Sequence, residues 1–120
     1  MENKDLVSRI VTSLDTHKAE NIQVIGITDL TSIADYFVIA NGSSNTQVKS
    51  LTDYVEEELA RAGVHPLRVE GYASASWILM DYGSVVVHVF REDTRQFYDL
   101  ERLWKDGSQL DVQEFLVNEE

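Results

Sequence analysis

The sequence contains no cysteine, and this absence excludes several kinds of chemistry at once. A chain without thiols cannot form a disulfide scaffold, a thiolate zinc site, an iron–sulfur cluster or a cysteine nucleophile. Any function must therefore depend on other side chains, or on the shape of a surface.

Long apolar runs are also missing. No stretch approaches the roughly 18 apolar residues that a membrane span needs. The first residues, MENKDLVSRIV, lack the basic start and continuous apolar centre of a signal peptide. We therefore expect a cytoplasmic protein with no membrane partner.

Basic residues are scarce, with 10 Lys and Arg against 21 Asp and Glu, which gives a formal net charge of −11. Affinity for nucleic acids depends largely on Lys and Arg neutralising phosphates. We expect little direct contact with RNA and none with DNA, whereas a basic protein partner would be attracted. The alternative is that the acidity only maintains solubility.

What the chain does contain is typical of one soluble domain. It has 120 residues, of which 43% are hydrophobic and 26% are charged. This length is sufficient for one core and too short for two comfortable ones. We predict a single compact α/β (α+β) domain over residues 1–107, followed by a polar, acidic tail of weak structure over 108–120.

Three segments have apolar residues at helical spacing. They are residues 4–18, a long helix that Ser43 or Ser44 caps and that ends near Gly63, and a helix from about Thr94 to Gly107. The long helix has the most regular stripe, which consists of Val48, Leu51, Val55 and Leu59. The third is predicted to bury one side, formed by Phe97, Leu100, Leu103 and Trp104.

Five segments have the patterns of strands: residues 22–27, 35–40, 67–70, 77–81 and 85–90. The last two face each other across a tight turn as an antiparallel hairpin. The long helix separates the second strand from the third, which implies a right-handed parallel crossover. We therefore predict a mixed five-stranded sheet packed against helices, and a turn over Asp29–Ser32.

The strand Trp77-Ile78-Leu79-Met80-Asp81 is apolar on both faces. Side chains alternate along a strand, so Trp77, Leu79 and Asp81 share one face and Ile78 and Met80 the other. If Ile78 and Met80 fill the core, the other face presents aromatic and charged groups, as protein-binding hot spots do. The alternative is that a helix of the same chain covers that face.

The best case for an enzyme is Asn41-Gly42-Ser43-Ser44, which lies between a buried strand and a helix, where free amides can bind phosphate. A Gly-Ser in this setting resembles nucleotidyltransferases, which also need two acids spaced D-x-D on a strand to bind magnesium. The next acids here, Asp53 and Glu56, fall within the long helix. We interpret the motif as a turn and a helix cap.

The three histidines, His17, His65 and His88, have no second ligand at HxH or HxxxH spacing. A single strand histidine such as His88 is more typical of a hydrogen-bonded core residue. We predict no catalytic residue, no cofactor and no metal site.

Three segments together resemble one protein family: DLTSIADYFVIANGSSNTQV, EGYASASWILMDYGSVVVHVF and REDTRQFYDLERLW. From about Leu6 to Gly107 the chain is similar to the ribosomal silencing factors of the RsfS, or Iojap, family. The resemblance implies a nucleotidyltransferase-like fold without the catalytic acids, in agreement with the missing D-x-D.

The resemblance also implies a function. Members bind the large ribosomal subunit through ribosomal protein uL14, stand in the way of the small subunit, and repress translation under nutrient limitation or in stationary phase. Organelle relatives act in ribosome assembly, so a large-subunit assembly factor is the alternative. A metal-dependent nucleotidyltransferase is a further alternative, and a homodimer of the free protein stays open.

Carried over by motif, the partner-binding surface of the family falls on two segments of this chain. These residues are Trp77, Leu79, Met80, Asp81, Tyr98, Leu100, Glu101 and Trp104. Strand alternation places Met80 on the core side, so the two lines of reasoning disagree there. Asp81 and Glu101 would face a basic ribosomal protein.

Overall fold

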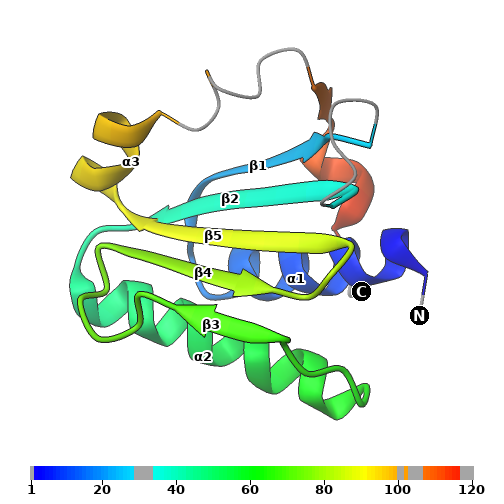
Figure 1. Ribbon diagram of the computed structural model, residues 1–120, viewed down its shortest axis with the longest axis horizontal. Coiled ribbons are helices and arrows are strands. Elements are labelled where there is room, and N and C mark those ends of the chain that lie inside the picture. Colours follow the sequence, from blue (N-terminus) through cyan, green and yellow to red (C-terminus); the bar gives the residue numbers. More distant parts are fainter. Residues whose placement is uncertain (1, 29–33, 100–101, 103–106, 117–120) are drawn as a thin grey trace.

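A computed structural model describes residues 2–28, 34–99, 102 and 107–116. Within this part, six strands form one mixed sheet in the order β3-β4-β5-β2-β1-β6. The elements are α1 (Asn3–Thr16), β1 (Glu20–Gly26), β2 (Tyr36–Gly42), α2 (Asn45–Arg61), β3 (Arg68–Glu70), β4 (Trp77–Asp81), β5 (Val85–Arg91), α3 (Glu92–Tyr98), β6 (Ser108–Leu110) and a 3-10 helix, η1 (Val112–Phe115). Helices α1 and α2 cover one face of the sheet (Figure 1).

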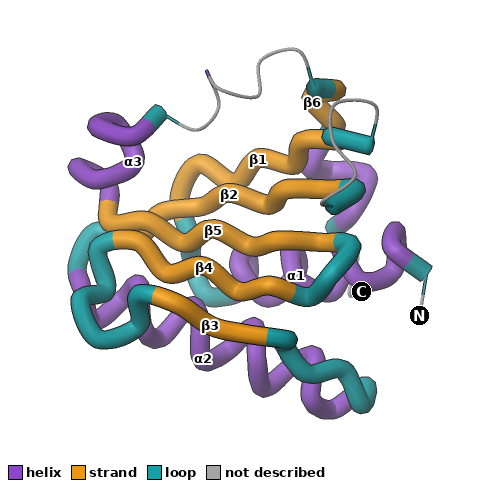
Figure 2. Tube along the Cα trace, viewed as in Figure 1, coloured by secondary structure: helices purple, strands orange, loops and turns teal. Residues whose placement is uncertain are grey.

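Helices α1 and α2 form where their apolar stripes predict them. Ser44 caps α2, because its hydroxyl oxygen accepts a hydrogen bond of 3.1 Å from the Gln47 amide. Gly63 follows the last turn with a positive φ of 77°. Both helices pack their buried faces against the strands, so that helices and sheet form two layers (Figure 2).

The sheet is mixed, as predicted. Strands β2 and β5 pair in parallel from Tyr36↔Val85 to Gly42↔Arg91, and the other neighbours pair antiparallel. The β4–β5 hairpin is confirmed, and β3 runs in the same direction as β2, as predicted for the connection through α2. Strand β5 lies inside the sheet, which explains why Val85–Phe90 has no exposed face.

Each face of the sheet has its own apolar cluster. The cluster on the helix side includes Ile78 and Met80 of β4. On the other side Trp77 and Leu79 pack, partly buried, against a second cluster: Ile25, Ile27, Ala34, Phe37, Ile39, Val86 and Phe90. The apolar groups on the two sides of β4 therefore belong to two separate clusters, one on each face of the sheet.

The prediction of five strands was wrong by one. Residues 108–110 form β6, which pairs with β1 through Val24↔Leu110, and Phe115 is buried in the core on the helix side. The Ser8 hydroxyl donates a hydrogen bond of 2.6 Å to the Phe115 carbonyl. Residues 108–116 of the segment expected to have weak structure therefore pack on the domain, held by partners more than 80 positions away that no local pattern reveals.

The third helix also differs from its prediction. It covers Glu92–Tyr98, and Asp99 follows in the left-handed region with φ 47°. Phe97, predicted to be in the core, is 82% exposed, while the buried residue of α3 is Arg95. Leu100, Leu103, Trp104 and the turn at Asp29–Ser32 lie outside the described residues.

No helix in the described ranges is both long and apolar enough to cross a membrane.

Candidate protein-binding surface

Strand β4 presents Trp77, Leu79 and Asp81 on the face opposite α1 and α2, as alternation predicted. All three are partly buried, whereas Ile78 and Met80 are 0% exposed. This corrects the assignment of Met80 to the partner-binding surface. Its side chain points into the core shared with the two long helices, so it cannot contact a partner.

Trp77 is the centre of an aromatic cluster. Its ring stacks on Phe90 of β5, with 5.0 Å between centroids, and lies 4.9 Å from the ring of Tyr98 on α3. The indole N–H donates a hydrogen bond of 3.1 Å to Nδ1 of His88. Tyr98 remains 48% exposed. The structure thus brings together two predicted site residues that lie 21 positions apart in the sequence.

Phe97 extends this cluster and was missed as a surface residue. It packs edge-to-face on Tyr98, with 5.2 Å between ring centroids. Sequence reasoning counted it as core because it falls on an apolar stripe at helical spacing. The structure instead buries Arg95, whose guanidinium donates to the Asn21 carbonyl and the Asn41 side chain, and this rotates Phe97 outward.

We call Trp77, Leu79, Phe97 and Tyr98 the aromatic surface. Of the eight residues predicted for the site, the structure places Trp77, Leu79 and Tyr98 on this surface and Asp81 at the far end of β4. Four intervals along a strand span about 13 Å. Leu100, Glu101 and Trp104 lie outside the described residues.

Asp81 has partners within the chain. Its carboxylate accepts a hydrogen bond of 2.8 Å from the Gly83 amide and forms an ion pair of 3.2 Å with Arg68. The side chain is only 21% exposed, so most of it is enclosed by these partners. Asp81 therefore stabilises the β4–β5 turn and offers a basic partner a charge that Arg68 already partly neutralises.

His88 lies beneath Trp77, in the centre of the sheet. Its ring is 4% exposed and contacts Phe37 edge-to-face, at 4.8 Å between centroids. Burial lowers the pKa of His88 to about 4, because the charged imidazolium loses its hydration there. The aromatic cluster is therefore uncharged at neutral pH.

The start of α2 is occupied by side chains of the chain itself. The Ser43 amide and hydroxyl both donate to the Gln47 side-chain carbonyl, at 2.6 and 2.9 Å. Together with the Ser44 cap, this confirms that Asn41-Gly42-Ser43-Ser44 is a turn and a helix cap. Asp53 and Glu56 are exposed on α2, and the described residues bring no three His, Asp or Glu side chains together where a metal ion would fit.

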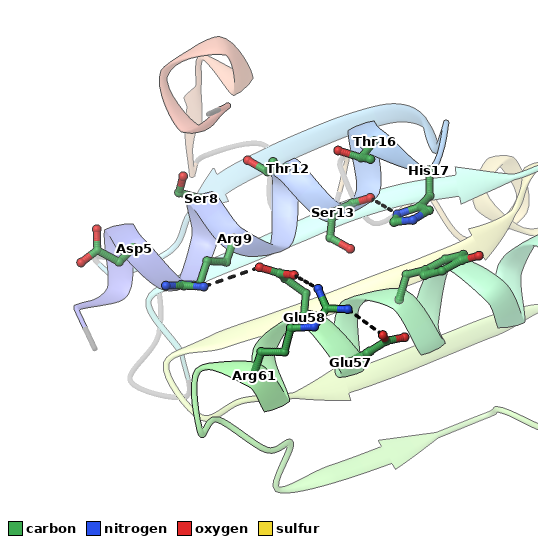
Figure 3. A pocket seen from close by; sticks show the side chains of 11 residues that line it. Asp5, Ser8, Arg9, Thr12, Ser13, Thr16, His17, Glu57, Glu58 and Arg61 are labelled. Atoms are coloured by element: carbon green, nitrogen blue, oxygen red, sulfur yellow. Dashed lines mark hydrogen bonds and ion pairs between the residues drawn. The ribbon is translucent and has the colours of Figure 1, made fainter. Parts of the chain in front are cut away.

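A groove of about 790 Å³ runs between α1 and α2 on the other face of the molecule (Figure 3). Four of the charged side chains that line it form ion pairs, Arg9 with Glu58 at 3.5 Å and Arg61 with Glu57 at 2.8 Å, and Asp5 also lines the groove. Most of the charge in the groove is therefore compensated within the chain.

Comparison with known proteins places these features in a family context. The family model described as "Ribosomal silencing factor during starvation" (RsfS) matches residues 1–120. The chain is 36% identical to the ribosomal silencing factor RsfS of Halalkalibacterium halodurans over 94% of this chain and 97% of that protein. It is 29% identical to the mouse protein "Mitochondrial assembly of ribosomal large subunit protein 1", over 82% of this chain and 44% of that protein.

The fold is also similar to that of solved structures. A crystal structure of a Chromobacterium violaceum protein superposes with a TM-score of 0.85 at 36% identity, over 92% of each chain. This agreement shows that the two proteins share one overall fold.

Proposed function

This chain belongs to the RsfS family of ribosomal silencing factors, and we propose that it represses translation by binding the large ribosomal subunit. In this proposal the aromatic surface docks on ribosomal protein uL14, and the bound domain prevents the small subunit from joining. We place this activity in the cytoplasm under nutrient limitation.

The observation that carries the proposal is the aromatic surface itself. Phe97 and Tyr98 are large, exposed hydrophobic side chains in contact with one another, and Tyr98 contacts Trp77. Aromatic side chains that are clustered on a rigid support are typical of hot spots in protein interfaces. A strand and a helix fix this cluster from two directions, so little ordering is needed on binding.

Charge supports a protein partner with basic residues. The chain has a net charge of −11, so ribosomal RNA would repel most of its surface, while a basic ribosomal protein would attract it. Because Asp81 is paired with Arg68, the attraction comes from the whole domain more than from that carboxylate. Leu100, Glu101 and Trp104 complete the proposed surface.

The mechanism is steric exclusion and includes no reaction. The domain measures 34 × 31 × 29 Å, which is large enough to separate two surfaces that must meet closely. Blocking requires only that the protein be bound at the subunit interface with a lifetime longer than the joining step.

A second function is favoured by one comparison. The mouse relative is named for assembly of the mitochondrial large ribosomal subunit. An assembly factor would use the same surface on an immature subunit. Binding to precursor particles in preference to mature large subunits would favour this alternative.

The test is a pelleting assay with purified large subunits and the variants Trp77→Ala and Tyr98→Ala. Removing an aromatic anchor costs roughly 2–4 kcal/mol, so affinity should fall ~30- to 1000-fold. The matched control is Tyr54→Ala, because Tyr54 is 43% exposed but lies on α2, beside the groove on the other face. Wild-type affinity of both surface variants, or an equal loss in the control, would contradict the proposed surface.

A further inference from the structure

The hydrogen bond between Trp77 and His88 determines the tautomer of the histidine. The indole nitrogen can only donate, so Nδ1 of His88 must accept and must carry no proton. The proton of the neutral ring is therefore on Nε2. That atom is buried and has no hydrogen-bond partner within the described part of the chain.

A buried N–H without a partner is unfavourable, which makes histidine a costly residue at this position. The surroundings are the rings of Phe37, Phe90 and Trp77, which suit a phenylalanine better. A phenylalanine would leave no unpaired N–H on β5. A phenylalanine would, however, provide no acceptor for the indole N–H of Trp77.

We infer that His88 is a positioning residue, which holds the Trp77 indole in a fixed orientation through the lone pair on Nδ1 and so preorganises the aromatic surface for its partner. The bond of 3.1 Å joins diagonal neighbours on adjacent strands, since in the β4–β5 register Phe90 is opposite Trp77 and His88 is opposite Leu79. The predicted effect of His88 on partner binding rests on the proposed function, whereas its predicted effect on the orientation of the indole does not.

This arrangement also specifies what Trp77 offers a partner. The indole N–H is used inside the domain, so the partner meets the ring and not a hydrogen-bond donor. An aromatic ring of this kind interacts best with apolar side chains or with the cationic groups of Lys and Arg. A basic protein surface provides both, whereas an isolated acceptor on the partner would gain nothing from Trp77.

The first test uses NMR on the free protein, with His88→Phe and His88→Gln. Phenylalanine keeps a ring and removes the acceptor, while glutamine retains a side-chain acceptor. The chain has two tryptophans, so Trp104→Phe assigns the Trp77 indole N–H signal. In His88→Phe this signal should shift upfield and its exchange with solvent should accelerate by about tenfold or more, as for a lost hydrogen bond. An unchanged signal would overturn the inference.

The second test is a double-mutant cycle for binding to large subunits. His88→Phe should weaken binding about three- to tenfold when Trp77 is present, and should add nothing in the Trp77→Ala background. His88→Gln should bind more tightly than His88→Phe. Equal losses in both backgrounds would show a general packing effect and would overturn a role through Trp77, as would wild-type affinity of His88→Phe.

The two proposals fail in different ways. If Trp77→Ala binds the large subunit as wild type does, the proposed surface is wrong, and the NMR result alone decides whether His88 orients the indole. If Trp77→Ala loses binding but His88→Phe leaves the indole signal unchanged, the surface stands and the positioning role falls. Denaturant unfolding of each variant shows whether the fold is retained.

Discussion

Among single residues, His88 is notable because a titratable side chain occupies the interior of the sheet, where burial lowers its pKa to about 4. In the unfolded chain the pKa of a histidine is about 6.5. Between these values the unfolded state binds more protons than the folded state. Stability should therefore decrease as pH falls through this window and should be insensitive to His88 above about pH 7.

We expect the free energy of unfolding to be about 2 kcal/mol smaller at pH 5.0 than at pH 7.5 because of His88 alone. Urea unfolding at the two pH values measures the difference. His88→Phe differs from the wild-type protein in this one titratable group, so this variant is the control and should show a pH dependence smaller by that amount. Identical pH dependence in both proteins would mean that His88 is not buried as a neutral ring.

Asp81 shows what sequence cannot reveal about a single residue. Strand alternation correctly placed it on the face of Trp77 and Leu79. It could not show that the carboxylate accepts a hydrogen bond from the Gly83 amide, or that Arg68 of β3 pairs with it. The Gly83 amide reaches Asp81 because of the conformation of the hairpin turn, and Arg68 reaches it because β3 is the strand paired with β4. Neither contact can be read from the sequence around Asp81.

Among the elements, β4 is positioned by a close contact with Gly71. This glycine has φ +81°, and a Cβ atom built on it would lie 2.1 Å from the Trp77 carbonyl oxygen. That distance is shorter than any tolerable contact, and the obstacle is backbone. The loop before β4 therefore requires glycine for its conformation and for the approach of the strand.

Gly71→Ala and Gly63→Ala make a matched pair. Gly63 also has a positive φ, of 77°, but nothing lies within 4 Å of its Cβ position. Gly63→Ala should cost about 1 kcal/mol of stability from backbone strain alone. Gly71→Ala should cost at least about 2 kcal/mol more, because Trp77 must move. Urea unfolding and the Trp77 indole signal measure the two effects, and equal losses in both variants would contradict the contact.

Elements with strong local patterns were predicted correctly, and elements that depend on distant partners were not. The regular stripe and a cap at Ser43 or Ser44 predict α2, and the apolar run followed by Gly83 predicts the β4–β5 hairpin. Strand β6 has only three residues and exists because β1 provides an edge. In α3, the hydrogen bonds of Arg95 to Asn21 and Asn41 decide which side faces inward, against the apolar spacing that favours Phe97.

For the candidate site the same division holds. Alternation on β4 predicted Trp77 and Leu79, and the helical pattern of FYDLERLW, together with the family resemblance, predicted Tyr98. The contact between β4 and α3, the exposure of Phe97 and the support from His88 are tertiary facts. They arise only when β5 places its C-terminal end, and the helix that follows it, beside the start of β4.

For the whole molecule, the two faces of the sheet differ in what covers them. Helices α1 and α2 cover one face (Figure 1), and most of the charged side chains in the groove between them are paired. The aromatic surface lies on the other face, at one end of β4. A strongly acidic domain with an apolar contact surface fits a basic protein partner. A self-associating protein would use the same patch on a second copy, and such a dimer should dissociate when large subunits are added.

The measurement that tests the central claim most directly is a sucrose gradient of large and small ribosomal subunits with the protein added. Wild-type protein should migrate with the large subunit and reduce the peak of joined ribosomes, while Trp77→Ala should stay at the top of the gradient and leave that peak intact. Tyr54→Ala should behave as wild type. If wild-type protein migrates with joined ribosomes, or if Trp77→Ala prevents joining as effectively as wild type, steric exclusion through the aromatic surface is contradicted.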